Sequence, residues 1–207
     1  MAIDPLKAQG YRTQRAELPE DLWQPMYDRA NYAAAGSTEI GFFSTPRGQS
    51  ATLITAGNSG VAKVKSYRDT NNENANVVPT KMFKIVGMSI AIVHNTYTAA
   101  TNADDRSKVK DGSYFQFRIV DKDVLFLPTI FIPEVNPLMA VSTTVTATTV
   151  NSATTGGGNA SMYKFPIPIT INPYENFSLS MKFDGTITVT NTLDIYVVLH
   201  AYMRRPT

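Results

Sequence analysis

The sequence predicts an all-β fold, and three observations support this prediction. Apolar and polar residues alternate through the last third of the chain, and a period of two places one face of each strand in a core. Charged residues make up only 17% of the 207 residues, while β-branched and aromatic residues, which favour strands, are plentiful. From residue 39 onward, turn signals separate short segments, and none of these has the periodicity of an amphipathic helix.

Residues 1–38 are predicted to form an N-terminal arm, and residues 39–207 a β domain. The arm mixes charged residues with three prolines, and one short helix is expected over residues 20–34, ending before Gly36. A single amphipathic helix with loose flanks cannot bury its own apolar face. We therefore expect the arm to pack on the body of its own subunit or on a neighbouring subunit.

The predicted helix contains the candidate residues for a contact between subunits. The only tryptophan of the chain, Trp23, lies in it, and tryptophan is frequent at the centre of protein contacts. The alternative is that Trp23 covers a sheet edge of its own chain. The interface candidates are Leu22, Trp23, Met26 and Tyr27.

The rest of the chain divides into segments with strand character. In chain order, strands are expected within residues 39–44, 51–56, 61–67, 82–94, 113–120, 124–132, 140–155, 165–171, 177–183 and 193–203. Residues 82–94 are apolar on both faces apart from an interruption at Gly87, which is typical of a central strand. Pro166 and Pro168 cannot donate to a partner strand, so residues 165–171 are expected at a sheet edge.

The number of expected strands decides between β architectures. About eight to ten strands, joined by tight turns and by long polar loops such as 69–79 and 95–112, indicate an antiparallel β-sandwich or jelly roll. No internal repeat is visible, which argues against a propeller or a β-helix.

Candidate chemistry is sparse. The chain has no cysteine, which excludes disulfides, thiolate nucleophiles and Cys-ligated metals. The two histidines, His94 and His200, lie far apart inside apolar strands, and no nucleophile or phosphate-binding motif occurs. Asp121 and Asp123 fit a hairpin turn better than a calcium site. We expect no enzyme activity, no catalytic residue, no metal site and no cofactor.

Charge and hydropathy limit the expected partners. The net charge of +2, spread along the chain, does not favour nucleic-acid binding by bulk electrostatics, so such contact is expected to be weak or absent. No apolar run reaches the length that spans a bilayer, and the first residues do not have the pattern of a secretory signal. We expect a protein made and retained in a cytosol, or assembled there.

Three segments carry a resemblance to a known family. A proline-and-acid turn leads into an alternating strand, PYENFSL at 173–179, and the last strand, DIYVVLH at 194–200, ends in MRRP at 203–206. Earlier, DTN at 69–71 precedes VPTKMFKI at 78–85. Over residues 60–205 the chain resembles jelly-roll structural proteins of bacteriophages and related virus particles.

The resemblance implies a virion structural protein. Such a capsid subunit would self-assemble into homo-oligomers through its arm and loops, and it would also contact other virion proteins. Assembly would take place in the host cytoplasm, without a membrane. The alternative is a receptor- or carbohydrate-binding jelly roll on a viral fibre or particle surface. That alternative predicts an aromatic-lined site among residues 95–112 and 151–160, with Tyr97, Tyr114 and Tyr163 as candidates. An enzyme on a cupin-like barrel is disfavoured, because it needs clustered histidine and carboxylate ligands.

Overall fold

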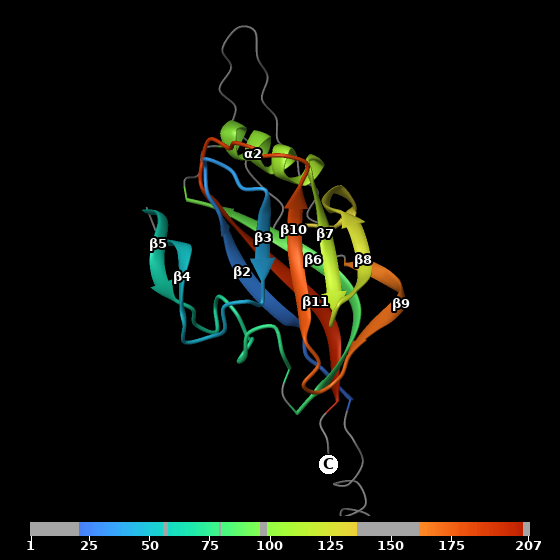
Figure 1. Ribbon diagram of the computed structural model, residues 1–207. Coiled ribbons are helices and arrows are strands. Elements are labelled where there is room, and N and C mark those ends of the chain that lie inside the picture. The colour runs from blue at the N-terminus through green and yellow to red at the C-terminus, as the bar shows by residue number, and fades with distance from the viewer. Residues whose placement is uncertain (1–20, 56–57, 79, 96–98, 136–161, 205–207) are drawn as a thin grey trace, which may run out of the picture.

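Two antiparallel β-sheets pack face to face, and a separate two-stranded hairpin lies to one side (Figure 1). The computed structural model describes residues 21–55, 58–78, 80–95, 99–135 and 162–204. This part of the chain contains eleven strands, one α-helix and one short 3-10 helix. The predicted all-β sandwich is therefore confirmed.

Sheet A contains the last strand of the chain as its central member. Its strands are β1 (Asp21–Trp23), β2 (Met26–Tyr32), β6 (Met82–His94), β9 (Tyr163–Ile171) and β11 (Leu193–Arg204). Strand β11 pairs with β6 on one side, and with both β1 and β2 on the other. Strand β9 forms the far edge beside β6, as its two prolines predict.

Sheet B is four-stranded, with the order β3-β10-β7-β8. Its strands are β3 (Glu39–Phe42), β7 (Ser113–Ile119), β8 (Lys122–Pro128) and β10 (Phe177–Phe183). The 3-10 helix η1 (Thr129–Phe131) follows β8, so the expected strand 124–132 ends earlier, at Pro128. The separate hairpin consists of β4 (Ser50–Thr55) and β5 (Asn58–Val64).

The strand pairs are nested in sequence. The first of the paired long strands, β2, lies beside the last, β11; inside that pair, β3 lies beside β10, β6 beside β9, and β7 beside β8. All four pairs are antiparallel. This is the arrangement that results when one long antiparallel hairpin is folded over into two facing sheets.

The core lies between the sheets and follows the predicted alternation. Every second residue of β11 is at most 1% exposed, from Leu193 through Met203, and the intervening side chains point to the outer face of sheet A. Strand β10 supplies Phe177, Leu179, Met181 and Phe183 from the opposite sheet. Gly87 breaks the run of apolar side chains in β6 but not the strand itself, and a Cβ there would lie 2.6 Å from the carbonyl oxygen of Tyr163.

The helix predicted over residues 20–34 is wrong where the chain is described, because residues 21–23 and 26–32 are strands β1 and β2. Strand β2 turns Met26, Asp28 and Tyr32 toward the interior, a period of two rather than a helical period. A fully buried Asp28 at one of these positions conceals the alternation in the sequence. Residues 1–20 of the predicted arm lie outside the described residues.

The polar loop predicted over residues 95–112 is also corrected, because residues 99–111 form a helix, α2 (Ala99–Asp111). The helix lies across one end of the sandwich (Figure 1). Asp105 holds it there: its carboxylate accepts the backbone N–H groups of Thr190 and Asn191 at 2.8 and 2.9 Å. The strand expected within residues 140–155 lies outside the described residues.

Candidate functional site

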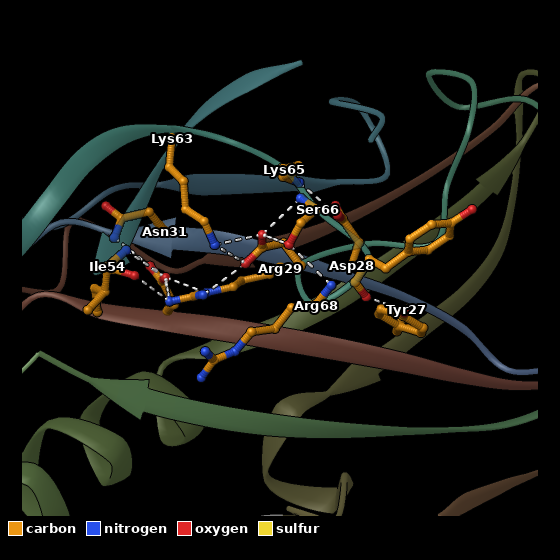
Figure 2. A network of polar contacts seen from close by, with 12 residues as sticks. Tyr27, Asp28, Arg29, Asn31, Ile54, Lys63, Lys65, Ser66 and Arg68 are labelled. Atoms are coloured by element: carbon orange, nitrogen blue, oxygen red, sulfur yellow. Dashed lines mark hydrogen bonds and ion pairs between the residues drawn. The ribbon is translucent and has the colours of Figure 1, made fainter. Parts of the chain in front are cut away.

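A network of buried charges joins the hairpin β4–β5 and the segment after it to the outer face of sheet A (Figure 2). Six charged side chains take part, three cations and three carboxylates. They come from β2, β5, the segment following β5 and β11. The six are Asp28, Arg29, Lys63, Lys65, Asp69 and Asp194.

Arg29 is the centre of the network. Its guanidinium is almost completely buried, and its Nε donates to Asp194 Oδ2 at 2.6 Å. Nη1 donates to Asp69 Oδ1 at 3.0 Å, and Nη2 donates to the carbonyl oxygen of Ile54 at 2.8 Å. The planar guanidinium of Arg29 thereby links β2 to β4, to β11 and to the segment that contains Asp69.

The Asp69 carboxylate receives donors from three directions. Lys63 Nζ lies 2.8 Å from Oδ2, and the backbone N–H and hydroxyl of Ser66 donate to the same oxygen at 3.0 and 2.9 Å. Burial favours the protonated acid, but hydrogen bonds from Lys63, Ser66 and Arg29 outweigh it and lower the pKa of Asp69 to about 2. Asp69 is therefore ionised at neutral pH.

Asp28 and Lys65 form a second buried pair on the inner side of β2. Lys65 Nζ donates to Asp28 Oδ1 at 2.7 Å, and the backbone N–H of Phe43 donates to Oδ2 at 2.6 Å. Burial raises the pKa of the Asp28 carboxyl, and the charge of Lys65 opposes that rise. The pair attaches the end of the hairpin to β2 and to the residue after β3.

These charges serve each other rather than a substrate. Three cations offset three carboxylates, and the carboxylate oxygens of Asp69 and Asp194 are occupied by donors of the same chain. A buried ionic network of this kind specifies one position for the hairpin, because in any other position a buried charge would have neither an ionic partner nor water around it. We conclude that it is a clamp between segments. No pattern in the sequence separates these six residues from surface charges.

The four interface candidates do not form one surface. Met26 is buried in the core, and Leu22 packs against the core. Tyr27 is half-buried, and its hydroxyl donates to the carbonyl oxygen of Tyr67. Only Trp23 presents much of its side chain to solvent, with 51% exposed on the outer face of sheet A.

Exposed apolar side chains lie instead on β8, η1 and β9; β8 and β9 are edge strands of the two sheets and lie on the same side of the sandwich (Figure 1). A groove of about 500 Å³ lies between β8 and β9 at this edge, with Leu125, Phe165 and Ile167 in its lining. Ile167, between the two prolines, is 80% exposed. The exposed apolar residues of the edge are Val124, Phe126, Ile130, Phe131 and Ile167.

The residues considered for chemistry or sugar binding lie apart from one another. Tyr114 packs against Phe126, with the ring centroids 6.4 Å apart, and Tyr163 packs against Phe165 at 6.1 Å. Tyr97 and residues 151–160 are outside the described part. The turn acid Asp123 accepts from Gln116 and pairs with Arg118, while the backbone carbonyl of Asp121 accepts from Arg118.

The two histidines occupy different surroundings. His94 is buried, and its Nε2 has no hydrogen-bond partner. His200 lies on the outer face of sheet A, with Nε2 2.8 Å from the hydroxyl oxygen of Ser89. In the described ranges, no group of three or more His, Cys, Asp or Glu side chains is arranged to hold a metal ion. Within those ranges, too, no helix has the length and apolarity required to cross a membrane.

Comparison with known proteins does not assign the chain to a family: no protein-family model matches its sequence, and no curated protein sequence matches it significantly.

Proposed function

We propose that this chain is a structural protein of a virus particle, a jelly-roll capsid subunit that assembles with copies of itself. The observation that carries the proposal is the nested pairing of β2 with β11, β3 with β10, β6 with β9 and β7 with β8. Eight antiparallel strands in two such sheets are the plan of jelly rolls, which occur in viral capsid proteins, lectins and cupins. The resemblance of residues 60–205 to phage and virus structural proteins favours the first of these classes.

The apolar edge supports self-assembly. Exposed apolar side chains beside an apolar groove, such as Val124 and Ile167 here, are typical of contact surfaces. Pro166 and Pro168 remove two N–H groups from the free edge of β9, which hinders the addition of a further strand there. A neighbouring copy would therefore contact this edge through side chains, with Ile167 foremost.

Replacing Ile167 by aspartate is expected to weaken assembly about thirty-fold or more, the effect of losing a central contact residue. Because Ile167 is 80% exposed, the unfolding midpoint of the isolated subunit should stay unchanged. Light scattering coupled to size-exclusion chromatography, over a range of concentrations, measures the assembly. The matched control is Val64→Asp, which changes an exposed valine on the hairpin, 58% exposed, and should assemble like the parent chain. A parent chain that remains monomeric at every concentration and salt condition would refute the proposed function.

The arm gives a second test of assembly. Residues 1–20 precede β1, and we propose that they contact a neighbouring subunit. A deletion must stop there, because residues 21–32 form two strands of sheet A. The chain without residues 1–20 is expected to keep its thermal midpoint and circular dichroism spectrum while assembling at least ten-fold more weakly. Unchanged assembly by light scattering would show that the arm takes no part in the contact.

A further inference from the structure

The outer face of sheet A carries an exposed aromatic cluster where β1 meets β11. Trp23 and Tyr202 are directly opposite each other in the strand register, and their rings meet edge to face with centroids 5.1 Å apart. The His200 ring lies 5.9 Å from Trp23 at a tilt of 32°. Trp23 and Tyr202 are about half exposed. The core-facing neighbours Leu22 and Met203 take the opposite side of these strands, so the rings are not needed to fill the interior.

Two lysines lie on the same face as these rings. The register runs from Trp23 to Tyr202, then to Lys84 of β6 and Thr170 of β9. The next outward row runs from His200 to Gly87 and then to Lys164 of β9. Both lysine side chains are exposed. These two rows hold no acidic residue, and in the adjoining row Asp21 of β1 stands opposite Arg204 of β11, so the surface beside the rings carries an excess of positive charge although the net charge of the chain is only +2.

We propose that this aromatic and basic face of sheet A binds single-stranded nucleic acid. Every base has a flat face that can stack on an exposed aromatic ring, and a positively charged surface beside the rings follows the phosphate chain. Lys84 lies two strands from Trp23, about 10 Å across the sheet, so a nucleotide stacked on the ring brings its phosphate chain within reach. The inference does not depend on the proposed function.

The composition of the face selects this ligand over others. A neutral sugar would use an aromatic ring but has no charge for Lys84 and Lys164. A second copy of the chain, related by a two-fold axis through this face, would bring the lysines of both copies into the same contact, and this repulsion between like charges is unfavourable. Duplex DNA keeps its bases stacked inside and offers the rings nothing but its backbone. Flat rings beside cations therefore favour unpaired bases joined by phosphates.

The single tryptophan makes the test direct, because Trp23 is the only source of tryptophan emission in the whole chain. Titrating the full chain with a twelve-residue oligodeoxythymidylate is expected to quench this emission. Binding measured by anisotropy of the labelled oligonucleotide should weaken about five- to a hundred-fold in Trp23→Ala and in Tyr202→Ala. Lys84→Ala and Lys164→Ala should each reduce the slope of log K against log salt by about 0.7.

Control variants test the same chemistry outside these two rows. Tyr174→Ala removes an exposed ring from the turn between β9 and β10, and Lys122→Ala removes an exposed cation from β8, and both should bind like the parent chain. Failure to quench Trp23, or equal binding of a sulfated polysaccharide with no effect of Trp23→Ala, would overturn the proposal. Loss of binding on deletion of residues 1–20, with Trp23→Ala unchanged, would also overturn it, because the arm would then be the site.

Discussion

Replacing Arg29 by alanine is expected to lower the free energy of unfolding by about 3–5 kcal/mol. The substitution leaves the Asp69 and Asp194 carboxylates, both fully buried, without the cation that lies between them. It also leaves the carbonyl oxygen of Ile54 without its donor, which separates the hairpin from sheet A. Urea unfolding at pH 7, followed by circular dichroism, measures the loss.

Arg118→Ala is the matched control for this substitution. Arg118 also pairs with an aspartate, Asp123, at 3.1 Å, but both side chains are about 40% exposed. An exposed pair of this kind contributes about 0–1 kcal/mol. Equal losses from the two substitutions would contradict the interpretation of the buried network as a clamp.

Acid should destabilise the fold through His94, by about 3 kcal/mol between pH 6.5 and pH 4. Burial and the neighbouring Arg106 lower the pKa of His94 from 6.5 to about 4, although Asp105 on the same helix opposes the shift. Above pH 6.5 the imidazole is neutral in both states, and this contribution to stability is complete. As the pH falls toward 4, the unfolded chain binds a proton that the folded chain does not, and the stability decreases.

His94→Leu should remove this part of the pH dependence, because leucine fills a similar volume and does not titrate. The measurement is urea unfolding of both proteins at a series of pH values. His200→Gln is the comparison: burial also lowers the pKa of His200, but this ring is only partly buried on the outer face, so the variant should reduce the pH dependence less than His94→Leu does. Asp69, with a pKa of about 2 against an ordinary 3.8, begins to lose its contribution below about pH 5, so the range from pH 6.5 to about 5 reports His94 without Asp69. An unchanged pH slope in His94→Leu would contradict the assignment.

The strands that the sequence predicts well have apolar inward positions without exception. In β10 and β11, each inward residue is apolar and buried, so the period of two is visible without a structure. The prolines of β9 likewise mark an edge strand, and the edge is where β9 lies. In these segments local preference and tertiary position agree.

The elements that sequence reasoning missed bury polar groups. Strand β2 turns Asp28 inward, where Lys65 and the Phe43 N–H satisfy it, and these partners lie 37 and 15 residues away. Helix α2 buries Asn102, Asp105 and Arg106 together with Val109, so its hydrophobic pattern carries almost no helical signal. The clamp around Arg29 was likewise beyond prediction, because its carboxylates are 40 and 165 residues distant along the chain.

The central position of β11 sets the order of events during synthesis. Strands β1, β2 and β6 are made early, yet each pairs with β11, whose last residue is Arg204. The ribosome therefore releases most of sheet A before its middle strand exists, and the exposed edges of β2 and β6 must stay unpaired until then. Folding of this domain can be completed only after translation has passed residue 204 and that strand has left the exit tunnel, so these edges stay exposed for longer than the edges of a protein built from local hairpins.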